Sequence, residues 1–161
     1  MNGIDERRSE EYVVAFVRHA GYVLLIRKAR PEWQAGKLNF PGGHIEEGEE
    51  PGDAAARELV EESHIMGREW LPKGHILFPG GRVHIWECEC ANPQQDPINM
   101  DETEPVAWYP MKGILNRTDL IPNLRVLIPM LYVGTTGITL KQVGAWYHVK
   151  LADLKPDEII V

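Results

Sequence analysis

The chain has 161 residues, of which 43% are hydrophobic and 25% are charged, and its formal net charge is −7. This length and composition suit one domain with a proper hydrophobic core, so we expect residues 1–161 to form a single domain. The acidic balance disfavours a nonspecific grip on nucleic acid, which needs clustered Lys and Arg.

The sequence also lacks the usual marks of a secreted or membrane protein. Cys88 and Cys90 are the only cysteines, and their spacing on one face of a strand disfavours a disulfide. The first residues are charged and lack the apolar core of a signal peptide. No apolar run approaches the roughly 20 residues that a membrane span needs. We therefore expect a cytoplasmic protein with free thiols and no membrane contact.

The first half of the chain predicts strands followed by a helix. Residues 12–28, rich in β-branched side chains, predict two strands around a turn at residues 19–21. We expect a short extended piece at residues 37–40 and a turn at Pro41-Gly42-Gly43. A helix is predicted to begin near Pro51, because proline suits the first helical position, and to run to about His64.

The second half predicts further strands and one more helix. Residues 73–90 predict a hairpin around residues 79–81, a polar acidic loop follows, and residues 106–110 predict a short strand. Residues 124–133 predict a helix despite Pro129, and residues 137–151 predict strand. The pattern indicates an α/β (α+β) fold in which helices pack on a mixed sheet.

Acidic residues are concentrated in one segment, where eight of the seventeen residues from Glu46 to Glu62 are Asp or Glu. At about 100° per residue, three carboxylates share one narrow face of the predicted helix, those of Glu58, Glu61 and Glu62. The opposite face is predicted to pack on the core, through Ala56, Leu59, Val60 and Ser63. Carboxylates this close raise one another's pKa unless a cation compensates, and Mg²⁺ prefers such oxygen ligands. The face is therefore either solvated or a divalent-cation site.

The flanking residues favour the cation site. Gly43, Glu49 and the run Arg57-Glu58-Leu59-x-Glu61-Glu62-x-x-Ile65 resemble the Nudix box, G-x5-E-x7-R-E-U-x-E-E-x-G-U, where U is aliphatic. Every fixed position matches except the second glycine, which is His64 here. That glycine normally ends the helix in a left-handed conformation, which histidine adopts at some cost. We expect the helix either to end at His64 or to continue to Gly67.

The resemblance implies a Nudix-type α/β/α sandwich and a metal-dependent pyrophosphohydrolase that uses Mg²⁺, with Mn²⁺ as a possible substitute. It implies that the metal is held by the side chains of Glu58, Glu61 and Glu62, with the carbonyl of Gly42 as a further ligand. Arg57 would orient the carboxylates, Glu49 would close the loop against the helix, and Gly43 would be structural. Two residues are candidates for the catalytic base, Glu58 and the loop residue Glu102.

Residues 24–49 resemble the MutT-like branch of nucleoside triphosphate pyrophosphohydrolases. The resemblance implies a (deoxy)nucleoside triphosphate substrate, an oxidised or modified purine such as 8-oxo-dGTP among the candidates, cleaved to monophosphate and pyrophosphate. Arg27 or Lys28 would contact the phosphates, Asn39 would lie on the floor of the base pocket, and Asn123 would read the base. Each asparagine equally fits a turn or a cap. Three aromatic residues are candidates for stacking on the base, namely Trp33, Phe40 and Trp86.

Other activities of the same family are alternatives. The substrate could instead be ADP-ribose, a nucleotide sugar or a dinucleoside polyphosphate. A nucleotide-binding sensor without catalysis is less favoured, because such domains usually lose box carboxylates and Glu58, Glu61 and Glu62 are all present. The resemblance implies a small-molecule nucleotide as partner, neither nucleic acid nor membrane, and homodimers are common in the family.

Overall fold

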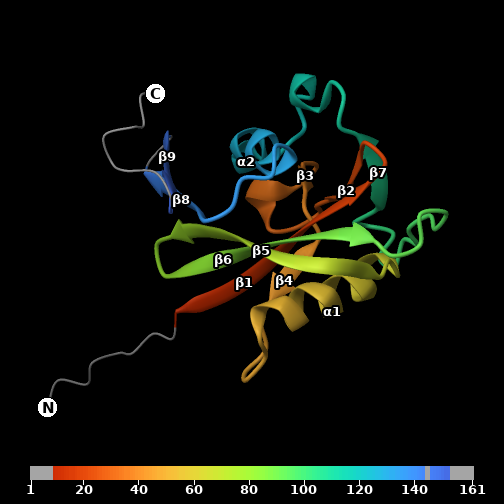
Figure 1. The fold of residues 1–161 in the computed structure, drawn as a ribbon, viewed down its shortest axis with the longest axis horizontal. Coiled ribbons are helices and arrows are strands. Elements are labelled where there is room, and N and C mark those ends of the chain that lie inside the picture. The colour runs from red at the N-terminus through yellow and green to blue at the C-terminus, as the bar shows by residue number, and fades with distance from the viewer. Residues whose placement is uncertain (1–8, 144–145, 153–161) are drawn as a thin grey trace, which may run out of the picture.

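The computed structural model describes residues 9–143 and 146–152, and two helices flank one mixed sheet (Figure 1). Within the described residues the sheet has nine strands, and its main path runs β3-β2-β1-β6-β5-β8-β9. The strands are β1 (Glu10–His19), β2 (Tyr22–Arg27), β3 (Leu38–Asn39), β4 (Gly42–His44), β5 (Gly67–Phe78), β6 (Gly81–Cys90), β7 (Val106–Pro110), β8 (Ile138–Val143) and β9 (Trp146–Leu151). The helices are α1 (Pro51–Ser63) and α2 (Pro122–Tyr132), with short 3-10 turns η1 (Glu32–Gln34) and η2 (Ile114–Asn116).

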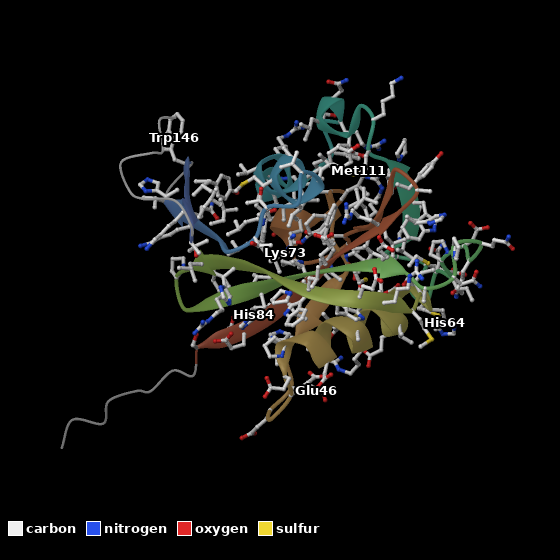
Figure 2. All side chains as sticks on the ribbon, viewed as in Figure 1. Glu46, His64, Lys73, His84, Met111 and Trp146 are labelled. Atoms are coloured by element: carbon white, nitrogen blue, oxygen red, sulfur yellow. The ribbon has the colours of Figure 1, made fainter. Side chains whose placement is uncertain are left out.

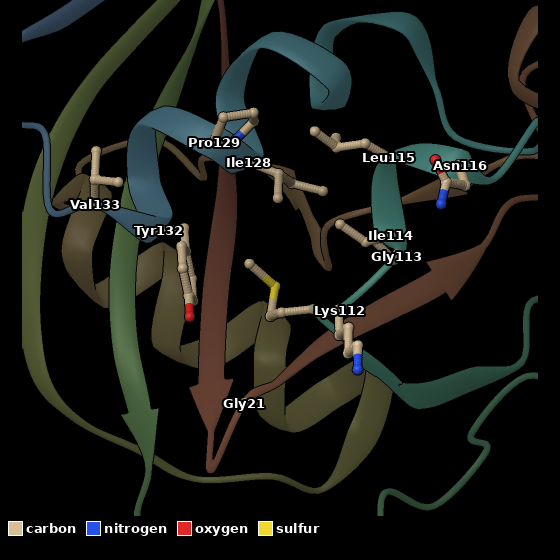
Figure 3. Close-up of a pocket in the computed structure, with 11 residues that line it drawn as sticks. Gly21, Lys112, Gly113, Ile114, Leu115, Asn116, Ile128, Pro129, Tyr132 and Val133 are labelled. Atoms are coloured by element: carbon tan, nitrogen blue, oxygen red, sulfur yellow. The ribbon is translucent and has the colours of Figure 1, made fainter.

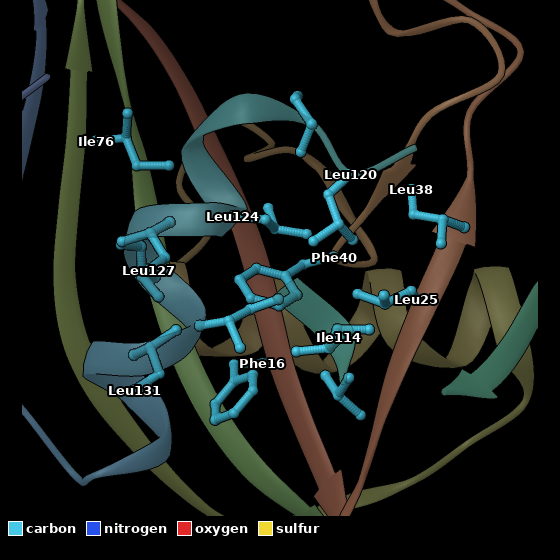
Figure 4. Close-up of a cluster of buried hydrophobic side chains, with 14 of the residues drawn as sticks. Phe16, Leu25, Leu38, Phe40, Ile76, Ile114, Leu120, Leu124, Leu127 and Leu131 are labelled. Atoms are coloured by element: carbon cyan, nitrogen blue, oxygen red, sulfur yellow. The ribbon is translucent and has the colours of Figure 1, made fainter. Parts of the chain in front are cut away.

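Helices α1 and α2 lie on opposite faces of this sheet (Figure 1), which confirms the predicted α/β/α sandwich. The larger core cluster fills the α2 side, where four α2 side chains are buried, Leu124, Leu127, Ile128 and Leu131 (Figure 4). Phe40, a candidate for base stacking, is 2% exposed and belongs to this core. Burial of its ring in the core therefore corrects the stacking prediction for Phe40.

Strands β1 and β2 diverge from the turn that joins them, and the divergence makes room for the segment that holds β3 and β4 (Figure 4). They pair with each other only next to the turn, at Arg18–His19 and Tyr22–Val23. Farther from the turn, β1 pairs with β4 and β2 pairs with β3. The chain between β3 and β4 therefore enters the sheet at the point where the two long strands separate.

The predicted turn at Pro41-Gly42-Gly43 is wrong, because the two glycines are the first residues of strand β4. Gly43 pairs with Val13 and Gly42 with Val14 of β1. A Cβ atom on Gly42 would lie 2.0 Å from the backbone oxygen of Val13, so a side chain cannot be accommodated there. Close approach of two backbones, rather than a turn, explains Gly42.

Helix α1 starts and ends where the sequence predicts. Pro51 is its first residue, and His64 follows it in the left-handed conformation with φ 57°. The His64 N–H donates to the carbonyl of Val60, and the Ser63 hydroxyl accepts from the Ile65 N–H, so the helix end is closed by hydrogen bonds. Histidine thus takes the conformation that the family assigns to glycine.

The buried face of α1 differs from the predicted one. Its buried residues are Ala54, Ala55, Leu59 and Ser63, whereas Ala56 is half-buried and Val60 is 40% exposed. Ala54 and Ala55 pack against Val13 of β1, because small side chains let the helix approach the sheet closely. The buried row of residues 55, 59 and 63 therefore adjoins the row of residues 54, 58 and 62, and two of the three carboxylates lie close to the sheet.

The remaining elements agree in type with the predicted ones, but β5 begins six residues before the predicted hairpin, and the segment predicted as strand over residues 137–151 contains two strands. Strands β5 and β6 form the hairpin around Gly80, and α2 accommodates Pro129 in its second half. Strands β8 and β9 pair antiparallel at the end of the described chain, and residues 144–145 of the predicted C-terminal strand lie outside the described residues. No helix in the described ranges combines the length and apolar character of a membrane span.

Candidate active site

The Arg57 guanidinium contacts three glutamates of the acidic segment. In Figure 2 the labels Glu46, before α1, and His64, after it, mark the two ends of this segment. Nε and Nη2 donate to the two oxygens of Glu49 at 2.8 and 3.0 Å. Nη1 donates to Glu58 Oε1 at 2.9 Å and to Glu61 Oε2 at 3.1 Å, and Nη2 donates to the His44 carbonyl at 3.0 Å. One side chain thus joins the helix, strand β4 and the loop between them. An organising role for Arg57 and loop closure by Glu49 would need contacts of this kind, and both roles stay predictions.

The same contacts fix the charges of this pair. The hydrogen bond from Arg57, together with a weaker contribution from the Glu46 N–H, lowers the pKa of Glu49 to about 2. The pKa of Arg57 is raised above its ordinary value, first by its hydrogen bond to Glu49. Arg57 is therefore a permanent cation that offsets part of the repulsion among its acidic neighbours.

Glu62 is the carboxylate of this cluster whose negative charge is least offset by hydrogen-bond donors and cations. Its Oε1 accepts a hydrogen bond from the Gly42 N–H at 3.2 Å, and its Oε2 is buried with no hydrogen-bond partner among the described residues. Burial raises the pKa of Glu62 to about 8, and the nearby Glu58 and Glu104 carboxylates act in the same direction. A buried carboxylate with a free oxygen needs a cation to ionise at neutral pH.

Glu58 lies directly against the backbone of strand β4. A Cβ atom on Gly43 would lie 2.5 Å from Glu58 Oε1, so a side chain at position 43 would displace this carboxylate from the strand. The Glu58 side chain is 14% exposed, whereas that of Glu61 is 56% exposed. Gly43 is therefore structural in a specific sense, because it lets a helix carboxylate reach the sheet.

The donor chemistry of these residues fits a divalent cation, although their present positions do not form a complete ligand set. Glu58, Glu61 and Glu62 offer carboxylate oxygens, and Glu62 Oε2 has no other partner. Within the described residues, no three His, Cys, Asp or Glu side chains converge as a ready metal-binding group. Arg57 engages one oxygen each of Glu58 and Glu61, and the oxygens left over are hard ligands of the kind that Mg²⁺ prefers.

The loop before β7 places a different glutamate at the site than the sequence predicts. Glu102 is exposed. Glu104 is only 8% exposed, and its Oε2 lies 2.9 Å from Lys28 Nζ and accepts a hydrogen bond from the Ala29 N–H at 2.9 Å. Burial alone would raise the pKa of Glu104, but hydrogen bonds from Lys28 and Ala29 outweigh it and hold the pKa below its ordinary value. Sequence reasoning missed Glu104, because its position depends on the pairing of β7 with β2.

The two predicted phosphate-binding residues have separate environments. Arg27 donates to the Gly36 carbonyl at 2.8 Å and to Asp119 Oδ2 at 2.9 Å, which ties the end of β2 to the segment before α2. Lys28 faces Glu104 instead and lies near enough to Glu62 to lower that residue's pKa. Of the two, Lys28 pairs with the site residue Glu104, whereas Arg27 pairs with Asp119.

The two predicted base-binding asparagines lie on neighbouring segments, because backbone hydrogen bonds join Leu38 of β3 to Asp119 and Ile121 before α2. The amide of Asn39 is held at both ends, by Gln34 Oε1 and by the Phe40 N–H. Asn123 lies in the first turn of α2, and its Oδ1 is buried without a partner among the described residues. An unpaired buried acceptor costs about 1–3 kcal/mol, so Asn123 is the amide with capacity for a ligand.

One sizeable cavity lies away from this site. It measures about 600 Å³ and lies between the second half of α2 and the chain after β7 (Figure 3). Its lining is mainly apolar and contains no acidic residue: Gly21, Met111, Lys112, Gly113, Ile114, Leu115, Asn116, Ile128, Pro129, Tyr132 and Val133. Carboxylate chemistry therefore belongs to the α1 site and not to this cavity.

Comparison with known proteins agrees with this geometry. The NUDIX domain family model matches residues 8–131. The chain is 33% identical over 102 residues to the 8-oxo-dGTP diphosphatase of Escherichia coli (strain K12), a match that covers 62% of this chain and 78% of that protein. A shorter stretch of 49 residues is 45% identical to the ADP-sugar pyrophosphatase of Mus musculus and covers 30% of this chain and 22% of that protein.

Solved structures show the same fold. The MutT protein from Bacillus halodurans superposes with a TM-score of 0.68 at 16% identity, over 88% of this chain and 97% of that one. The NUDIX hydrolase from Nitrosomonas europaea superposes with a TM-score of 0.65 at 19% identity, over 83% of this chain and 80% of that one.

The family model and the relative from Escherichia coli show that the chain belongs to the Nudix family, as a MutT-like member. It is a hydrolase of phosphoric anhydride bonds in small nucleotide substrates, and its family needs a divalent metal ion.

The raised pKa of Glu62 predicts an unusual pH dependence of stability in metal-free protein. The ordinary pKa is 4.5 and the folded-state pKa is about 8, so ionisation favours the unfolded chain between these values. Stability should therefore be lost as the pH rises from about 4.5 to 8, by roughly 1.4 kcal/mol per unit of pKa difference. Thermal melting in a chelator across this range should show a falling melting temperature for wild type and a flatter profile for Glu62→Gln. Glu61→Gln, an exposed control, should keep the wild-type slope; an equally steep slope in Glu62→Gln would contradict the assignment.

Proposed function

We propose that the protein is a Mg²⁺-dependent pyrophosphohydrolase, for which Mn²⁺ can substitute, that converts a (deoxy)nucleoside triphosphate and water into the monophosphate and pyrophosphate. The observation that carries the proposal is the buried, unpartnered Oε2 of Glu62, next to the Glu58 side chain of the same helix, which lies against Gly43 of strand β4. An oxidised purine nucleotide such as 8-oxo-dGTP is the leading substrate. The Escherichia coli relative, an 8-oxo-dGTP diphosphatase, and the free acceptor of Asn123 support this choice.

In this proposal Glu58, Glu61 and Glu62 would hold the metal, with the Gly42 carbonyl as a further ligand. When bound, the ion would activate the attacking water and neutralise charge on the phosphates. Arg57 keeps the carboxylates aligned, and Glu49 anchors Arg57 in turn. Lys28 would contact the phosphate chain, because its ammonium lies beside the carboxylates while Arg27 is held by Asp119.

Proton transfer needs a carboxylate close to the attacking water. Glu58 is favoured over Glu102 as the base, because Glu58 lies within the cluster against Gly43 and Glu102 is exposed on its loop. Asn123 would read the nucleobase and Asn39 would form the floor of its pocket, since β3 and the start of α2 are neighbours. An asparagine both donates and accepts, so it can pair with a purine edge.

A product assay tests this function directly. Purified protein with Mg²⁺ would be given normal and oxidised (d)NTPs, ADP-ribose, nucleotide sugars and dinucleoside polyphosphates, with the products separated by ion exchange. The proposal predicts monophosphate plus pyrophosphate from one triphosphate well above the rest. Cleavage confined to an ADP-sugar would instead favour the second candidate, to which the 45% identity with the mouse ADP-sugar pyrophosphatase points.

Substitution of Asn123 tests how the base is selected. Asn123→Ala removes the buried acceptor, so the preference between the best purine triphosphate and its unmodified counterpart should fall about tenfold in kcat/KM, the worth of one hydrogen bond. Turnover on the best substrate at saturation should change much less. The matched control is Asn116→Ala, an asparagine lining the remote cavity, which should leave the preference intact. An unchanged preference in Asn123→Ala would remove this residue from the pocket.

A further inference from the structure

Glu104 engages Lys28, and the surrounding backbone fixes this carboxylate in place. The Ala29 N–H donates to Glu104 Oε2, the Glu104 N–H donates to the Asp101 carbonyl, and the Arg27 N–H donates to the Pro105 carbonyl. The loop before β7 is thus attached to the end of β2 at Glu104 and at Pro105. The Glu104 carboxylate is 8% exposed and is held in place by these contacts.

The Lys28 ammonium pairs with one carboxylate and acts through space on a second. Its ion pair is with Glu104, at 2.9 Å, and its positive charge partly offsets the rise that burial causes in the pKa of Glu62. Glu62 Oε2 nevertheless has no hydrogen-bond partner. A lysine side chain is long and flexible, so an ammonium released from Glu104 would turn to this free oxygen. The oxygen would then be occupied by an internal cation.

We propose that Glu104 is a positioning residue that holds Lys28 away from Glu62, so that Glu62 is free to bind a divalent metal while Lys28 faces the phosphate chain. The inference rests on the proposed function and assigns a role to a residue outside the Nudix box. Glu104 acts through Lys28 and touches neither metal nor substrate. Its loop neighbour Glu102, which is exposed, has no part in this arrangement.

A double-substitution cycle read by metal binding tests the proposal without any substrate. Mn²⁺ would be titrated into nucleotide-free wild type, Glu104→Gln, Lys28→Gln and the double variant, and free Mn²⁺ followed by electron paramagnetic resonance. Glutamine at position 104 can still accept from the Ala29 N–H but no longer pairs with a charge. Glu104→Gln should weaken Mn²⁺ binding about tenfold, or 1.4 kcal/mol, because the released Lys28 occupies Glu62. Adding Lys28→Gln should restore binding at least to the wild-type level.

The outcomes separate positioning from a general effect on the loop. If Glu104→Gln binds Mn²⁺ as wild type does, or if the double variant binds as weakly as Glu104→Gln, the proposal is wrong. Glu102→Gln is the matched control and should bind as wild type. Should Glu104→Gln melt at a much lower temperature, Glu104→Asp, which keeps the charge on a shorter side chain, should give an intermediate affinity that Lys28→Gln again restores. Failure of the proposed hydrolysis would appear in the product assay alone, since Mn²⁺ binding needs no nucleotide.

Discussion

The contact between the Glu62 carboxylate and the Gly42 N–H is the constraint on which the site depends. It brings an acidic side chain of α1 against a strand backbone and leaves one of its oxygens buried without a partner. Such a group destabilises the folded protein until a cation arrives. The rest of the local structure makes this contact possible. Strands β1 and β2 diverge so that β4 can enter the sheet, and both glycines of β4 lack the side chains that would block the approach.

Arg57 supplies the positive charge that the other carboxylates of the segment need. Its contacts to Glu49, Glu58 and the His44 carbonyl connect the helix to β4 through one permanently charged group. The cation offsets part of the repulsion in a segment with eight acidic residues, but it does not touch Glu62. In the proposed function, Arg57 aligns Glu58 and Glu61 while Glu62 Oε2 stays free for the metal. The proposal therefore explains why the folded protein tolerates a destabilising buried carboxylate at this position.

Much of this architecture could be predicted from the sequence because its signals are local. Pro51 and the residue at position 64 set the ends of α1, and alternating β-branched residues set the long strands. The failures concern contacts between distant segments. Pro41-Gly42-Gly43 has the composition of a turn, yet pairing with β1 makes Gly42 and Gly43 a strand. A helical wheel shows which residues of α1 are polar but not the angle at which α1 meets the sheet, so Val60 was placed in the core and is exposed.

The loop glutamate illustrates the same limit on local reasoning. Glu102 matches the spacing typical of MutT-like relatives, but the pairing of β7 with β2 places Glu104, and not Glu102, beside Lys28. A shift of two positions along this loop separates an exposed carboxylate, Glu102, from a buried one, Glu104. Only the three-dimensional register of β2 and β7 supplies that information.

The central claim is that the buried Glu62 carboxylate binds the metal ion and is needed for hydrolysis. The most direct measurement is the turnover number of Glu62→Gln on the best nucleotide substrate at saturating Mg²⁺, beside its melting temperature at neutral pH. The account predicts a loss of about 100-fold or more in kcat, the size typical of removing one electrostatic group from an active site, with a melting temperature equal to or above that of wild type. Turnover within a few-fold of wild type would contradict it.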